Sequence, residues 1–366
     1  MIEVIRNIDE LELIKESINQ LADNFKMPLL RYEWLKNTAI TCCPPGKLNF
    51  IILKENDEIT AVAPLVIVSD LFSERLEIIG TSVHKEPGGF LYKNSESLNA
   101  LIEEIINLEK PVFIKGIKIF SSLSFALESL LKNKKKYCFV TGASIPFLPI
   151  SESWESFQKR ISSSRRSSFR RLERIGREMG ELTTEIVTPS ENEVDGQIEE
   201  VFNVEASGWK GRTGTAMKLN SGLGIFFKNY SRDAARLGIL RICFLRINSK
   251  AIAAQIGVVY ANRFWSLKIG YDENWSKCSP GILLMNEMIR YAFDNRLEAV
   301  EFLGSDESWL HIWTNHTRRL ITYRIFSSPV SSTLNLFVEY SGSMFRKIRY
   351  HFVKSLMKEQ PANVKV

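Results

Sequence analysis

Residues 251–289, AIAAQIGVVYANRFWSLKIGYDENWSKCSPGILLMNEMI, decide the fold that we expect for this chain. The segment 251–260 is apolar and rich in β-branched residues, and 264–271 alternates bulky with smaller or polar side chains, so each predicts a β-strand. Ala261-Asn262-Arg263 lies between them and predicts a hairpin turn. The polar stretch 272–278 predicts an irregular loop that leads into a helix.

The helix begins at Ser279-Pro280-Gly281, with serine at the cap and proline at the first helical position, where its missing N–H costs nothing. A helix start that follows a strand and a loop presents free backbone N–H groups and the positive end of the helix dipole, which favours an anion site. Gly281 has no Cβ, so a phosphate could approach the backbone closely. The alternative is that these residues only start a helix, the more common outcome for such a motif taken alone.

Length and composition favour a globular protein of two domains, or of one large α/β unit. The chain has 366 residues, of which 45% are hydrophobic and 25% are charged. No apolar run is long enough to cross a bilayer, and the N-terminus has acidic residues where a secretory signal would be basic. We therefore expect a cytoplasmic protein, or one that acts at the cytoplasmic face of a membrane assembly. Of the five cysteines, Cys42 and Cys43 are adjacent and the others are scattered, and the four histidines are dispersed, so the sequence predicts neither a disulfide framework nor a metal site.

The positive charge of the chain is unevenly placed. The formal net charge is +6, and 159–177, KRISSSRRSSFRRLERIGR, holds much of the excess. Such a segment could bind nucleic acid, anionic lipid or a polyanionic substrate. The alternative is a solvated helix face, in which Glu173 and Glu178 pair with arginines one turn away.

The order of the expected elements predicts an internal duplication. The segments 49–68, NFIILKENDEITAVAPLVIV, and 240–259, LRICFLRINSKAIAAQIGVV, each predict a strand, a polar turn and a strand rich in alanine and valine. We therefore predict an α/β fold with two domains in tandem, each a central mixed sheet flanked by helices. Their expected bounds are 1–150 and 151–330, followed by a basic amphipathic helix and a polar tail over 331–366.

Four segments in the second half resemble a known family. They are RRSSFRRLER, EASGWKGRTGTAM, the stretch from AAQIGVVYANRFW to the SPGILLMNEMI helix, and FLGSDESWLHIW, and their order and spacing match as well. The chain resembles the GNAT-superfamily acyltransferases of bacterial cellulose and exopolysaccharide biosynthesis. These in turn resemble the Fem-type peptidoglycan aminoacyltransferases, which hold two GNAT-like domains in tandem. The resemblance covers most of 150–325 and is weaker over 28–90, where Trp34 and AVAPL fit the first domain.

The resemblance implies transfer of an acyl group, usually acetyl, from a coenzyme A thioester to an amine or hydroxyl, without a metal. It implies that one strand pairs through its backbone with the pantetheine arm, and we expect Gln255, Ile256 and Gly257 there. It also implies that the helix start takes the pyrophosphate, at Ser279, Pro280, Gly281, Ile282 and Leu283. Gln255 lies inside an apolar strand, so its side chain could instead bond to a neighbouring strand. The first domain is expected to be structural or to shape the acceptor cleft, without binding coenzyme A.

The reaction needs a base for the acceptor, donors for the oxyanion and an acid for the thiolate. Asp306 and Glu307 are the candidates for the base or for positioning the acceptor, although either could simply cap the next helix. Tyr271 is the candidate acid, and could equally be a core residue. The expected acceptor-side residues are Trp209, Lys210, Asp272, Trp309 and His311, of which His311 could also act as a base or only pack.

One departure from the family is clear. The family commonly has a Tyr-Lys pair where this chain has Trp309-Leu310.

The sequence is consistent with three functions. The leading interpretation is an acyl-coenzyme A-dependent N- or O-acyltransferase that acts on a sugar, a polysaccharide precursor or a small amine. The first alternative is a Fem-like transferase that uses aminoacyl-tRNA, the one case in which nucleic acid would be a partner. The second is a catalytically silent GNAT-like binding module in an envelope-polysaccharide assembly.

Overall fold

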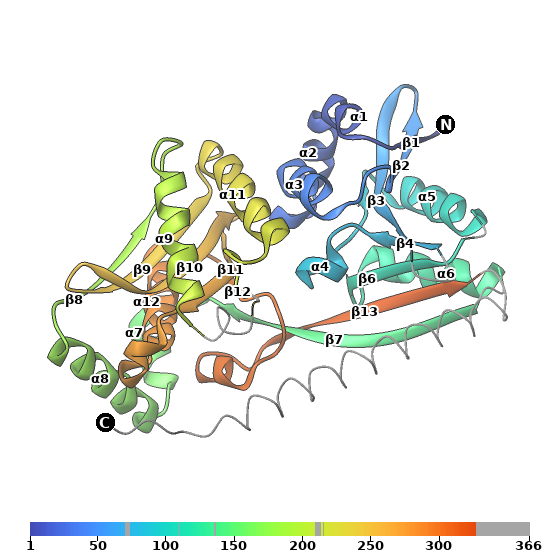
Figure 1. Ribbon diagram of the computed structural model, residues 1–366. Helices are drawn as coiled ribbons and strands as arrows, with labels where there is room; N and C mark the ends of the chain where they lie inside the picture. Colours follow the sequence, from blue (N-terminus) through green and yellow to red (C-terminus); the bar gives the residue numbers. More distant parts are fainter. Residues whose placement is uncertain (70–73, 109, 135–136, 209–213, 215, 327–366) are drawn as a thin grey trace, which may run out of the picture.

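One long mixed sheet runs through the whole molecule (Figure 1). The computed structural model describes residues 1–326 except 70–73, 109, 135–136, 209–213 and 215. In these residues thirteen strands form the sheet, twelve of them in the order β1-β2-β3-β4-β6-β13-β7-β12-β11-β10-β9-β8, with β5 beside β3. Helices flank the sheet, so the expected mixed α/β class is confirmed. The expected segment 331–366 lies outside the described residues.

The first half of the sheet comes from the N-terminal part of the chain. Its strands are β1 (Ile2–Ile5), β2 (Leu48–Glu55), β3 (Glu58–Ser69), β4 (Glu74–Ile78), β5 (Leu91–Tyr92) and β6 (Val112–Lys118). Its helices are α1 (Ile8–Leu13), α2 (Lys15–Asp23), η1 (Pro28–Leu30), α3 (Tyr32–Cys42), α4 (Thr81–His84), α5 (Ser95–Asn107) and α6 (Ser122–Lys134).

The second half follows the same order of elements. Its strands are β8 (Leu182–Val187), β9 (Leu240–Ile247), β10 (Lys250–Tyr260), β11 (Arg263–Tyr271) and β12 (Ala299–Glu301). Its helices are α7 (Trp154–Arg160), α8 (Ser163–Glu178), α9 (Val194–Ala206), α11 (Ser221–Arg236), η2 (Glu273–Cys278), α12 (Pro280–Asp294) and η3 (Ser308–Ile312). In each half an antiparallel series of four strands leads through a helix, α5 or α12, to a strand parallel to the fourth, β6 or β12.

The compared hairpins use the same kind of turn. Asn56 and Asp57 join β2 to β3 with φ angles of 48° and 64°, and Asn248 and Ser249 join β9 to β10 with 49° and 66°. Two consecutive positive φ angles are those of the two-residue turn that matches strand twist. The shared turn and the shared strand order support the internal duplication. The boundary near residue 150 stays a prediction.

Two long strands tie the halves together. Strand β7 (Tyr137–Pro149) follows the N-terminal half but pairs at its end with β12, while β13 (Thr317–Phe326) follows the C-terminal half and pairs with β6. The two also pair with each other over ten residue pairs, and Figure 1 shows them side by side, running from the C-terminal half along the N-terminal half. Each half therefore completes its sheet with the last strand of the other.

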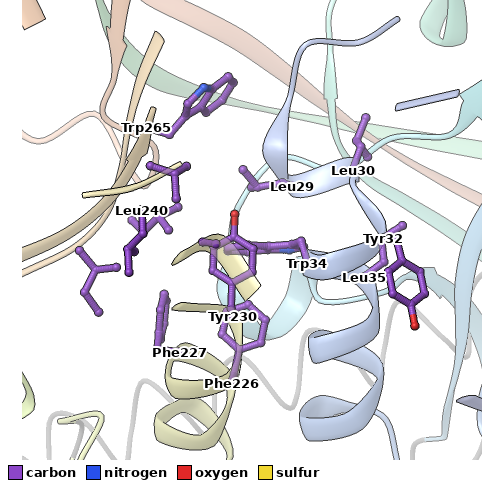
Figure 2. Close-up of a cluster of buried hydrophobic side chains, with 14 of the residues drawn as sticks. Leu29, Leu30, Tyr32, Trp34, Leu35, Phe226, Phe227, Tyr230, Leu240 and Trp265 are labelled. Atoms are coloured by element: carbon purple, nitrogen blue, oxygen red, sulfur yellow. The ribbon is translucent and has the colours of Figure 1, made fainter. Parts of the chain in front are cut away.

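A buried aromatic cluster also joins the halves. Trp34 on α3 packs edge-on against Phe226 and Tyr230 on α11, with ring centroids 4.8 and 4.9 Å apart. Figure 2 shows these side chains pointing toward one another from the two helices. One hydrophobic core contains residues from both halves, so burial of this cluster stabilises their association.

Candidate active site

Strand β11 is paired along its whole length on one side only. Its partner β10 runs antiparallel to it from Ala253 to Tyr260, whereas parallel β12 pairs only with Arg263–Trp265. The pairing with β12 ends at Trp265. The chain turns away after β12 through Leu303 and Gly304, which have φ angles of 58° and 61°. The two parallel strands therefore separate after Trp265.

A cavity of about 550 Å³ lies where this strand ends and α12 begins. Its size is in the range of small-molecule sites, which span roughly 300–1,000 Å³. Residues of α9, the end of β11, η2, the start of α12 and η3 contribute to the wall: Glu205, Gly208, Ile269, Gly270, Tyr271, Ser276, Ser279, Gly281, Ile282, Glu307 and Trp309. Six of the residues selected from sequence thus meet at one cavity: Tyr271, Ser279, Gly281, Ile282, Glu307 and Trp309.

The start of α12 borders the cavity. Ser279 is in the left-handed region at φ 47°, its side chain makes no capping bond, and Pro280 follows at the first turn of the helix. The carbonyl of Ser279 accepts the N–H groups of Ile282 and Leu283, at 3.0 and 3.2 Å. A Cβ at Gly281 would lie 3.2 Å from the Tyr271 ring, so glycine lets the helix approach the end of β11. The positive end of a 15-residue helix therefore points toward the cavity.

Two carboxylates line the cavity, one of them fixed. Glu205 at the end of α9 is buried, and its Oε2 accepts the backbone N–H of Met217 at 2.8 Å. Helix α9 reaches this position because Gly270 has no side chain, since a Cβ there would lie 2.8 Å from the Glu205 Cα. Glu307, directly before η3, is the exposed carboxylate of the cavity wall.

Helix η3 separates the sequence candidates into two groups. Glu307 and Trp309 face the cavity, whereas the His311 Nε2 lies 2.9 Å from the Asp306 Oδ1, and His311 lines a different cavity. Leu310 is buried in the core of the C-terminal half. The position at which the family commonly has lysine therefore holds a packing residue in this chain.

The remaining candidates lie elsewhere. Gln255, Ile256 and Gly257 are in β10, whose backbone pairs with β9 and β11 on its two sides, and Gln255 donates to the Ser266 hydroxyl at 2.7 Å. Asp272 is buried, and it accepts bonds from Asn274 and Lys250. These four residues are not part of the cavity wall.

Of four more candidates, two lie in α12 and two lie outside the described residues. Pro280 and Leu283 are buried in α12, and the Leu283 side chain packs in the core. Trp209 and Lys210 lie outside the described residues. Their roles at the acceptor side remain predictions.

Several site residues were not selected from the sequence. Glu205, Gly208, Ile269, Gly270 and Ser276 join the cavity through packing between α9, β11 and η2. Glu205 and Gly208 belong to the motif EASGWKGRTGTAM. The sequence therefore indicates this segment as part of the site, but it does not single out these two residues.

The N-terminal half reaches the same region through Glu86. The Oε2 of this residue accepts the N–H of Gly304 at 3.1 Å, in the turn just beyond β12. Burial raises the pKa of the Glu86 carboxyl, against the opposing effects of the Gly304 N–H and of Lys268 on β11. A carboxyl from the first half is thereby held beside the gap between β11 and β12.

A family comparison agrees with this geometry. Residues 163–310 match the model of the acetyltransferase (GNAT) domain. This segment is therefore similar to a GNAT acetyltransferase domain. The match and the fold together support an acyltransferase, and no curated protein matches the sequence.

Solved structures are similar over nearly the whole chain. The crystal structure of FemX has a TM-score of 0.58 at 13% identity, covering 86% of this chain and 98% of that one. The C-terminal domain of a putative lysylphosphatidylglycerol synthetase from Agrobacterium fabrum has a TM-score of 0.55 at 10% identity, covering 90% and 96%. L-PGS from Bacillus licheniformis has a TM-score of 0.53 at 14% identity, covering 88% and 96%. At these identities the similarity concerns the fold.

Two kinds of feature are absent from the described residues. They contain no group of three or more histidine, cysteine, aspartate or glutamate side chains arranged to hold a metal ion. They also contain no helix with the length and apolar character that a membrane span requires.

Proposed function

We propose that this protein transfers an acyl group, usually acetyl, from a coenzyme A thioester to an amine or hydroxyl of a sugar, a polysaccharide precursor or a small amine. One observation carries the proposal: the end of β11, beyond its pairing with β12, and the start of α12 meet at the same cavity of about 550 Å³. An extended amide-containing arm can pair with a free strand edge. A helix start with a nearby glycine favours a phosphate.

The pantetheine arm is assigned to the edge of β11 beyond Trp265, and the pyrophosphate to the first turn of α12 around Gly281. This assignment replaces Gln255–Gly257 as the pantetheine strand, because β10 already pairs on both sides. Lys277 of η2 is exposed beside the helix start, and α8 packs against η2. These elements supply positive charge near the phosphates.

Glu307 is assigned as the base that takes the proton of the acceptor. The acceptor then attacks the thioester carbon, the oxyanion collapses, and the carbon–sulfur bond breaks. The Tyr271 hydroxyl is assigned to protonate the departing thiolate, and the position of Tyr271 in the cavity wall beside Gly281 supports this assignment. Asp306 is assigned to acceptor positioning through His311, to which it is bonded. Glu86 and the N-terminal half border the acceptor side of the gap.

The test is binding of acetyl-coenzyme A by calorimetry, with the variants Gly281→Asp and Gly281→Asn. The two side chains have nearly the same size, so only the charge differs at the proposed phosphate position. We expect Gly281→Asp to lower affinity by about tenfold or more relative to Gly281→Asn, because a carboxylate repels the phosphates. The carboxylate also favours the helix start, so loss of folding is not the expected cause. Equal affinities for the two variants would place the phosphates elsewhere.

A second candidate donor, aminoacyl-tRNA, has its own supporting observation. Arg170 and Arg171 are exposed on α8 and make no ion pair within the described residues, whereas Arg174 and Arg177 pair with Glu178 and Glu173. The similarity of the fold to that of FemX is compatible with this candidate. If acetyl-coenzyme A does not bind, a tRNA affinity that falls steeply with salt would favour this donor.

A further inference from the structure

A second, polar cavity lies on the other side of η3 from the site described above. It has a volume of about 510 Å³ and is lined by the end of α7, the start of α8, the end of η3 and the loop that leads into β13. The basic residues of its wall are Arg160, Arg165, His311 and His316. No carboxylate is among the described residues that line it. From this we infer a binding site for a phosphate or phosphoryl group.

Each of the two arginines is held by a bond to a neighbouring group and also lines the cavity. Arg165 donates to the His311 carbonyl at 2.6 Å, and Arg160 pairs with Glu152 at 3.0 Å. A guanidinium carries five N–H donors, so each arginine has donors left for a ligand. Arginine forks match phosphate oxygens in geometry and charge.

The start of α8 adds a second source of donors. Ser162 caps this 16-residue helix by accepting the N–H of Arg165, and it lines the cavity together with Arg165. Asn315 contributes an amide at the opposite wall. Arg166 bonds three carbonyls at the end of α7, at 2.7–3.1 Å, and thereby removes the acceptors that would otherwise repel an anion there.

Helix η3 connects this site to the proposed reaction. Trp309 faces the donor cavity and His311 faces the polar cavity, and two residues of such a helix differ by about 4 Å along its axis. A phosphorylated acceptor that is anchored in the polar cavity could therefore extend its amine or hydroxyl past η3 toward Glu307. The role of this ligand as an acceptor rests on the acyltransferase activity proposed above, whereas the anion site itself does not.

The first experiment titrates the protein with inorganic phosphate at constant ionic strength and follows the imidazole resonances of His311 and His316 by NMR. The double variant Arg160→Gln/Arg165→Gln is expected to weaken phosphate binding about tenfold or more. The matched control is Arg170→Gln/Arg171→Gln, which removes the same charge from exposed positions of the neighbouring helix face. We expect this control to stay within about twofold of the unmodified protein.

A second variant guards against a loosened η3, because Arg165 bonds the His311 carbonyl. Arg160→Gln/His316→Gln leaves that bond in place, and it is also expected to weaken phosphate binding. Unchanged binding in both cavity variants, or an equal loss in the control, would overturn the site.

Measurements in the Gly281→Asp protein separate this inference from the proposed donor site. Phosphate binding is expected to survive there, even where acetyl-coenzyme A binding is lost. Phosphate binding that disappears with Gly281→Asp but persists in the arginine variants would place the anion at α12 and refute the inference. With a functional acceptor, phosphate is expected to raise the acceptor KM and leave donor affinity unchanged. An acyltransferase that phosphate does not inhibit would refute the acceptor role alone.

Discussion

At the scale of single residues, the structure distinguishes three polar side chains that the sequence presents as similar. Asp306, Glu307 and His311 lie within six positions, yet only Glu307 lines the donor cavity. Asp306 is bonded to His311 on the far side of η3. Side-chain direction in a short helical turn depends on its packing, and Leu310 and Trp313 fix this turn by being buried. The sequence therefore identifies these residues as candidates, but it does not show which of them lines the donor cavity.

Glu307→Gln is expected to slow turnover by about 10²–10⁴-fold, the usual contribution of a positioned base. The amide keeps the size of the side chain, so acetyl-coenzyme A affinity should change by no more than about twofold. The measurement is release of free thiol under saturating donor, beside calorimetry of donor binding. Asp306→Asn is the comparison, and it should mainly raise the acceptor KM. Equal losses of turnover and donor affinity in Glu307→Gln would indicate a structural role for this carboxylate.

Two glycines explain why other site residues could not be selected in advance. A Cβ at Gly208 would lie 2.8 Å from the Tyr271 carbonyl oxygen, and one at Gly270 would lie 2.8 Å from the Glu205 Cα. These contacts bring α9 against the end of β11, although the two are more than 60 positions apart in sequence. A glycine in a strand suggests close approach of another backbone. It does not say which backbone approaches.

At the scale of elements, the two strands, the hairpin turn and the helix expected over 251–289 are confirmed. The turn between β10 and β11 has φ angles of 49° and 58° at Ala261 and Asn262, and the helix begins at Pro280. Local patterns specify such elements because turn chemistry and side-chain alternation act over a few residues. Which strand has a free edge is a matter of long-range pairing. The periodicity of β10 and β11 therefore could not show that the pairing of β11 with β12 ends at Trp265.

Hydrogen exchange can test this assignment at the level of the strand. On addition of acetyl-coenzyme A, amides in 266–271 are expected to exchange more slowly, because the pantetheine arm covers this part of β11. Amides in β10 are expected to change little, since they already lie between two strands. The measurement is exchange followed by mass spectrometry, with and without donor, and with Gly281→Asp as the protein that should show no protection. Protection confined to β10 would favour Gln255–Gly257 as the pantetheine strand.

At the scale of the whole molecule, the halves share strands and a core. The exchange of β7 and β13 places the end of each half in the sheet of the other, and no local pattern in either strand encodes that choice. The internal duplication was visible because hairpins repeat in sequence, whereas the crossing depends on how two finished halves fit together. The aromatic contact between α3 and α11 reinforces it, together with an Asn37–Asp233 hydrogen bond of 2.7 Å.

His84 makes this junction sensitive to acid. Its ring lies between Trp34 and Phe226, with centroids 5.2 and 4.2 Å away, and only 6% of the residue is exposed. Burial, with the nearby Lys268, lowers the pKa of His84 from 6.5 to about 4. Between these values the unfolded chain binds a proton that the folded protein does not bind. Stability due to this group is therefore complete above about pH 6.5 and falls as the pH drops toward 4.

The shift corresponds to about 3 kcal/mol of unfolding free energy across that window. The measurement is urea unfolding of the unmodified protein and of His84→Gln from pH 7 to pH 4, because the difference between them cancels the other titrating groups. The free-energy advantage of histidine over glutamine should shrink by about this amount as the pH falls. A difference that stays constant with pH would mean that His84 protonates equally well in the folded junction.

Because the ring contacts both halves, its protonation should lower the stability of both together, in one transition followed by tryptophan fluorescence and by circular dichroism. Separate transitions for the two probes would show that the shared strands and core do not couple the halves.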